Sequence, residues 1–283
     1  MRMNQLALIV TAAMTLAACS AAEVGGPTTE VGGSTTEQPG PPAEPTPVIQ
    51  IRLEGGFRPV ESILGDGPTL TLMSDGQLIS LGPIPEIFPG PLVPPYQTQT
   101  ISADDIDRIM DLVEEIGLPE MVDEFDDSAA AFVADAGTEV ITYWDGNGAH
   151  RYSVYALGIG ANPLNPDEPI DPRTEAFAEL WEMMGNLGLE AAEPYQPEAV
   201  RVIAGLSMSD PDPQFVDVRD WPLDDDQPGS WTRVNQDWTC QTFGPEVLDI
   251  FTDATQTTTW SLQAEEYKLL VRPLLPGEPD CPI

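Results

Sequence analysis

Apolar and polar residues alternate in short segments through much of the chain, which predicts β-hairpins. In the first case apolar side chains recur at 69–73 and 77–81, and the turn between them contains Asp75-Gly76. Asp-Gly accepts the positive φ angles of a tight turn, so this stretch predicts a hairpin. The predicted hairpins join 69–73 to 77–81, 140–144 to 151–155, and 258–263 to 267–271.

Helical periodicity follows the first two hairpins. Ser102 begins a helix, with Asp105 three residues on as in a capping box, and Gly117 ends it. Asp171 begins a second helix, and a shorter third is expected over 244–254. The residues expected to face inward are Ile106, Ile109, Met110, Val113 and Ile116 in the first helix, Phe177, Leu180, Trp181 and Met184 in the second, and Val247, Leu248 and Phe251 in the third.

This order of elements predicts the fold class and the domain organisation. Hairpins that alternate with single helices predict an α+β fold with antiparallel sheets, since a parallel sheet would alternate single strands with helices. Further single strands are expected at 48–53, 200–204 and 215–218. The predicted segments are a lipoprotein signal peptide (1–18), a disordered Gly/Pro/Thr-rich tether (19–47), a hairpin–helix repeat module (48–190) and a C-terminal α+β module with a disulfide (196–283).

The first 19 residues have the features of an export signal. A positive end with Arg2 precedes an apolar run that is shorter than the ~20 residues of a membrane-spanning helix. The run ends in Leu16-Ala17-Ala18-Cys19, which resembles the lipobox of bacterial lipoproteins. The resemblance implies cleavage before Cys19, acylation of the new N-terminus (palmitate is a typical chain) and anchoring at the extracytoplasmic face of the cell membrane. The alternative is an ordinary secretory signal with an incidental cysteine.

The charge balance limits the classes of partner. The chain has 47 acidic residues against 11 Lys and Arg, a net charge of −36, so it repels phosphates and binding to nucleic acid is excluded. One interpretation of the acidity is solubility in a salty medium, and the other is cation binding or docking to a basic partner.

The sequence contains few residues suited to catalysis. His150 is the single histidine, at the edge of a predicted hairpin, and neither a G-x-S-x-G elbow nor a phosphate-binding loop occurs. A catalytic zinc would need more histidines. A hydrolase that works through two carboxylates stays open as an alternative, because 47 acids make any one pair uninformative.

Acidic clusters in predicted loops are candidate calcium ligands, since hard oxygen ligands on loops suit Ca²⁺. None has the EF-hand spacing, and solvated acidic loops are the alternative. The candidate calcium ligands are Asp123, Asp126, Asp127, Asp224, Asp225 and Asp226.

Cys240 and Cys281 form an even pair in a chain predicted to be exported, which predicts a disulfide between the start of the third helix and the C-terminus. A redox or metal pair is the alternative, although the spacing is not C-x-x-C.

The Pro-rich segment 83–95 is interpreted as a packed loop or a partner-binding surface. The tryptophans of the last third, interpreted as core residues or as a sugar-binding cluster, are Trp221, Trp231, Trp238 and Trp260.

Three segments resemble uncharacterised actinobacterial exported proteins and lipoproteins. They are the C-terminal pattern from Trp260 through Tyr267-Lys-Leu-Leu-Val-Arg272 and Pro276 to Cys281, the loop Glu86-Ile-Phe-Pro-Gly-Pro, and Ser153-Val-Tyr-Ala-Leu-Gly158. The resemblance covers most of residues 65–283 and implies no activity. We therefore expect a non-enzymatic binding module that contacts a protein of the cell envelope, with a carboxylate hydrolase and a calcium-stabilised surface module as alternatives.

Overall fold

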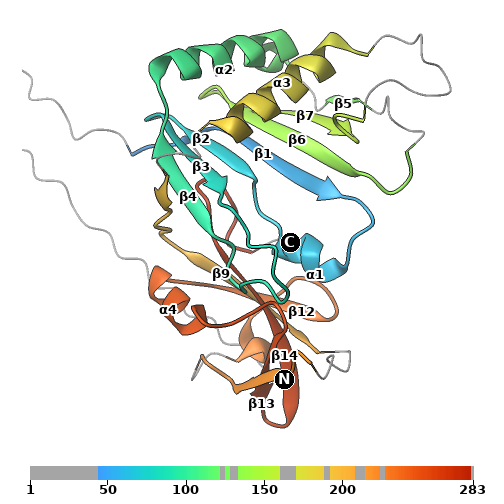
Figure 1. Cartoon of the computed structure of the whole chain (residues 1–283), viewed down its shortest axis with the longest axis vertical. Helices are drawn as coiled ribbons and strands as arrows, with labels where there is room; N and C mark the ends of the chain where they lie inside the picture. The colour runs from blue at the N-terminus through green and yellow to red at the C-terminus, as the bar shows by residue number, and fades with distance from the viewer. Residues whose placement is uncertain are drawn as a thin grey trace, which may run out of the picture. The chain divides into compact units, whose positions relative to one another are not determined.

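The computed structural model describes residues 44–121, 125–127, 133–159, 170–187, 192–207, 214–223 and 227–281, with the backbone alone for 125–127. Residues Glu44–Ile283 form one compact unit. It is an α+β fold rich in strands, built on two β-sheets (Figure 1). The predicted signal peptide, Cys19 and all of the predicted tether up to residue 43 lie outside the described residues.

The first sheet has eight strands and contains two of the predicted hairpins, β2–β3 and β6–β7, which are confirmed. The turn of the first hairpin has Gly76 at φ +82°, the conformation for which Asp-Gly was expected. In spatial order the strands are β5 (Phe125–Asp127), β7 (Ala149–Tyr155), β6 (Gly137–Trp144), β1 (Pro47–Gly55), β2 (Leu70–Met73), β3 (Gln77–Leu81), β4 (Tyr96–Thr100) and β8 (Glu193–Pro194).

The second sheet has six strands, and its β13–β14 hairpin confirms the third predicted one. The expectation of purely antiparallel sheets is wrong for two edge strands, because β5 pairs with β7 and β10 pairs with β13 in parallel. Parallel pairing needs a long connection, and residues 221–257 separate β10 from β13. In spatial order the strands are β10 (Asp217–Asp220), β13 (Thr258–Leu262), β14 (Glu265–Pro273), β9 (Val200–Leu206), β12 (Trp238–Phe243) and β11 (Thr232–Arg233).

Two long helices cover one face of the first sheet, as Figure 1 shows. The predicted caps of α2 are confirmed: the Ser102 hydroxyl accepts a hydrogen bond from the Asp105 backbone N–H at 3.1 Å, and Gly117 is left-handed. The third predicted helix is shorter than expected, a 3₁₀ turn followed by α4. The helices are α1 (Val60–Gly65), α2 (Ala103–Ile116), α3 (Pro172–Asn186) and α4 (Leu248–Phe251), and the 3₁₀ turns are Leu118–Glu120, Pro228–Ser230 and Pro245–Val247.

Each of the two sheets packs against its own apolar cluster. The first lies between the first sheet and the helices α2 and α3, where Tyr152 and Phe177 are fully buried. The expectation that Trp181 faces inward is wrong, since it is 41% exposed. The interpretation of the late tryptophans as core is confirmed for three of them, whose exposed fractions are 6% (Trp231), 6% (Trp238) and 3% (Trp260).

A polar contact connects the two sheets through the C-terminal segment. The buried carboxylate of Glu278 accepts hydrogen bonds from the Arg272 guanidinium of β14 at 2.6 and 2.9 Å, and Arg52 of β1 lies 3.5 Å away. The same segment carries Cys281, which is disulfide-bonded to Cys240. The predicted disulfide therefore has the expected partners, but Cys240 lies in β12 and not at the start of a helix.

Candidate functional site

Two of the six candidate calcium ligands, Asp126 and Asp127, lie among the residues that the structure describes. Asp123 and Asp224, Asp225 and Asp226 lie outside the described residues. The expectation that Asp126 and Asp127 lie in a loop is wrong, because their backbone forms β5 and pairs with β7. Among the residues that the structure describes, no group of three or more His, Cys, Asp or Glu side chains is arranged to hold a metal ion. Calcium binding stays a prediction.

His150 is held in place at the start of β7. Its Nδ1 lies 2.7 Å from the Met121 carbonyl oxygen and its Nε2 lies 3.3 Å from the Asp145 carboxylate. The hydrogen bond to Met121, and then the Asp145 carboxylate, raise the pKa of His150, although partial burial opposes the shift. These contacts connect the β6–β7 turn to the end of the 3₁₀ turn Leu118–Glu120, and they supply a structural reason for this histidine.

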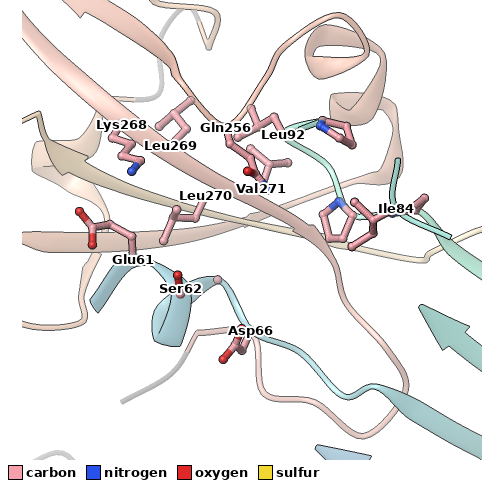
Figure 2. Close-up of a pocket in the computed structure, with 14 residues that line it drawn as sticks. Glu61, Ser62, Asp66, Ile84, Leu92, Gln256, Lys268, Leu269, Leu270 and Val271 are labelled. Atoms are coloured by element: carbon pink, nitrogen blue, oxygen red, sulfur yellow. The ribbon is translucent and has the colours of Figure 1, made fainter. Parts of the chain in front are cut away.

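The candidate functional site is a recess of about 310 Å³ between α1, the Pro-rich loop and β14 (Figure 2). Its apolar floor is the β14 segment Leu269–Val271, and Leu92 with the prolines Pro91, Pro94 and Pro95 forms a wall. Helix α1 approaches the floor closely, since a Cβ atom at Gly65 would lie 3.9 Å from Leu270. Prolines keep the loop extended and stiff, so the recess is largely preformed.

Charged groups lie at the edges of this recess. Glu61 of α1 and Lys268, the single lysine of the chain, are found at one end, and Ile84 is found at the other (Figure 2). Asp66 follows α1, and its carboxylate forms an ion pair with Arg58 at 2.6 Å. Burial raises the pKa of Asp66, while the hydrogen bond and charge of Arg58 oppose that shift. The carboxylate is thus a fixed ion-pair partner, and His150 does not line the recess.

The Pro-rich loop and helix α1, which form two sides of the recess, both carry exposed apolar side chains, and Ile84 is the one of these that lines the recess. On the loop, Ile84 is 49% exposed, and both Ile87 and Phe88 are 66% exposed. The interpretation of this loop as packed is therefore wrong for Ile87 and correct for Leu92, which is 8% exposed, and Phe88 is packed in part, since its ring lies edge-on against Phe215 with 4.9 Å between the ring centroids. Helix α1 contains no buried residue. Apolar side chains displayed around an apolar recess are typical of a surface that binds a partner.

Helix α1 and the residues that it contributes to the recess are not predicted by the pattern of the sequence. The sequence does contain a weak indication of this helix, because Pro59 precedes Val60, Ile63 and Leu64, which have helical spacing. Six residues are too few for periodicity to distinguish a helix from a loop.

No protein-family model, curated protein or solved structure matches this chain. In the described ranges, no helix combines the length and the apolar composition needed to cross a membrane.

Proposed function

We propose that the chain is an exported lipoprotein, anchored through Cys19 at the extracytoplasmic face of the cell membrane, and that it is a non-enzymatic binding module for a protein of the cell envelope. The lipobox-like Leu16–Cys19 and the low-complexity segment 20–43 support the anchor and the tether, and the predicted end of the tether at residue 47 is four residues too late, because Thr46 is hydrogen-bonded to Ser74 and Pro47 begins β1. The hairpin–helix units form the folded part that the tether holds away from the membrane.

The recess between α1, the Pro-rich loop and β14 carries the proposal of binding. It combines an apolar floor with the half-exposed Ile84 at its edge, an arrangement that can bury the apolar side chains of a partner. Glu61 at its edge and the net charge of −36 on the chain favour a partner that carries positive charge. We propose that the occupant is a peptide segment of an envelope protein with apolar side chains and at least one Lys or Arg.

Selection from a displayed library of random peptides tests the docking site, with the mature chain carrying Cys19→Ser as the target. The enriched peptides should combine apolar residues with Lys or Arg. Ile84→Lys should weaken their binding at least tenfold, because it removes an apolar contact and places a positive charge that repels the basic peptide. The matched control is Ile250→Lys on α4, which changes an isoleucine that is 43% exposed and does not line the recess. No enrichment, or equal binding to both variants, would overturn the site.

Fractionation of cells tests the anchor independently. We expect the native chain in the membrane fraction with palmitate incorporated, and the Cys19→Ser variant unprocessed and free of palmitate. If Cys19→Ser stays in the membrane fraction and no unprocessed form appears, the lipobox interpretation is wrong. This result would leave the docking site untouched, because the two experiments change different parts of the chain.

A further inference from the structure

A second recess, of about 560 Å³, lies between helix α3 and the β6–β7 hairpin. It is separate from the docking recess and shares no residue with it. Its polar and aromatic lining residues are Glu139, Trp181, Glu182 and Asn186.

Trp181 is the aromatic surface of this recess. It lies among the residues of α3 that helical spacing assigns to the apolar face, yet 41% of it is exposed, whereas Phe177 and Leu180 are fully buried. The faces of an indole ring carry partial negative charge and attract organic cations. An exposed indole next to carboxylates is therefore suited to a positively charged ligand.

Two carboxylates in the recess have no cationic partner. No ion pair in the described part of the chain involves Glu139 or Glu182. Burial raises the pKa of Glu139, since backbone N–H groups compensate only part of its lost hydration. The segments 160–169 and 188–191, which are close in sequence to lining residues, contain no Lys, Arg or His. A positive ligand would neutralise this pair of acids.

Open space in the recess fits a compact cation. Cβ atoms at Gly158 and Gly185 would meet nothing within 4 Å, so the backbone at both positions leaves room. Two carboxylates and one amide are fewer oxygen ligands than the six to eight that Ca²⁺ takes, whereas an alkylammonium group needs only a few acceptors and an aromatic face.

We propose that this recess binds an alkylammonium group, stacked on Trp181 and neutralised by Glu139 and Glu182. The group belongs either to a small organic amine or to the side chain of a lysine in a protein, and the chemistry of recognition is the same for both. This inference does not depend on the docking recess of Figure 2.

Titration calorimetry with tetramethylammonium chloride tests the proposal at constant ionic strength, in the folded chain with Cys19→Ser. Tert-butanol, a neutral molecule of nearly the same shape, is the control ligand. We expect saturable binding of the cation and at least tenfold weaker binding of tert-butanol. Nα-acetyl-lysine amide, whose side-chain ammonium is free, distinguishes the two sources. If this compound binds and tetramethylammonium does not, the site takes a lysine side chain. The reverse result indicates a small amine. Equal binding of tert-butanol, or no binding of either cation, would overturn the proposal.

Three variants locate the binding. Glu139→Gln keeps the shape of the side chain and removes its charge, so it should weaken binding at least tenfold. Gly185→Leu should abolish binding by filling the open space, and it should not unfold α3, because leucine favours a helix more than glycine does. Glu179→Gln, an exposed carboxylate on the same helix, should bind like the native chain. Unchanged binding in Glu139→Gln and Gly185→Leu, with melting curves that show both folded, would refute the site.

Discussion

The ion pair between Glu278 and Arg272 offers the sharpest test of how this fold is held together. Both side chains are almost fully buried, with exposed fractions of 2% for Glu278 and 3% for Arg272. Burial alone would lower the pKa of Arg272, but the hydrogen bonds and charge of Glu278 raise it. We consider the substitution Glu278→Gln, which keeps the size of the side chain and removes its charge.

The expected loss is large because positive charges would remain without compensation. Arg201 lies in the same region, where its guanidinium donates to the backbone carbonyls of Pro279 and Asp280, and burial together with Arg272 lowers its pKa to about 10. Glu278 is the carboxylate that offsets these buried guanidinium groups. Removing one partner of a buried pair costs about 3–5 kcal/mol, and for a domain of this size that predicts a fall in melting temperature of about 6–20 °C.

Urea denaturation of the oxidised protein measures this loss, with an unchanged m value as the sign that the folded state is the same. The control Glu179→Gln should change the free energy of unfolding by less than about 0.5 kcal/mol, since its side chain is exposed. The double variant Glu278→Gln with Arg272→Met should recover more than about 1 kcal/mol of the loss, because it removes the stranded charge. A loss below about 1 kcal/mol in Glu278→Gln, or simple additivity in the double variant, would refute the reasoning.

Further predictions concern three other contacts. Substituting both Cys240 and Cys281 with Ser removes the disulfide and should lower the free energy of unfolding by at most about 4 kcal/mol, the chain-entropy value for a loop of 41 residues. Urea denaturation measures this loss, and a larger loss would show that the bridge also organises the folded state. His150 is the single histidine of the chain, so its ring protons can be followed by NMR. They should titrate with a pKa above the ordinary value for histidine, because the ring is hydrogen-bonded to the Met121 carbonyl. Its stabilising effect should be present below the ordinary pKa and lost as the pH rises through the raised one, so a pKa at or below the ordinary value would contradict the structure. Gly67→Ala should destabilise the fold by about 1–3 kcal/mol in thermal denaturation, since its Cβ would lie 2.5 Å from a buried guanidinium nitrogen; a neutral effect would show that the two sheets adjust easily.

Local signals in the sequence predicted most of the individual elements. Asp75-Gly76 located the first turn, and Ser102 with Gly117 located both ends of α2, because caps and tight turns depend on residues within a few positions. The β13–β14 turn was found from its flanking strands alone, since Gln263 and Ala264 adopt positive φ without the usual glycine or asparagine.

The arrangement of elements in space was less predictable. The parallel pairing of β10 with β13 depends on where a long connection crosses, and no residue within β10 records it. Trp181 has the spacing of a core residue, but a helix that covers a sheet has room for only part of its apolar face beneath it. Both recesses join segments that are distant in the sequence, such as α1 with β14, so the residues that line them cannot be recognised from spacing.

The distribution of the basic residues explains why both proposed sites favour positive ligands. Apart from Arg2 in the predicted signal peptide, the chain has ten Lys and Arg residues. Seven of these are used internally: Arg201 is buried against backbone carbonyls, and six other arginines form ion pairs with Asp or Glu, namely Arg52, Arg58, Arg151, Arg173, Arg219 and Arg272. Because 47 acids outnumber these ten basic residues, and most of the ten are already held by ion pairs or backbone carbonyls, the charge that the chain presents to a partner is predominantly negative. A partner with a basic segment and a ligand with an alkylammonium group both satisfy that field, so binding in both recesses should weaken as the salt concentration rises.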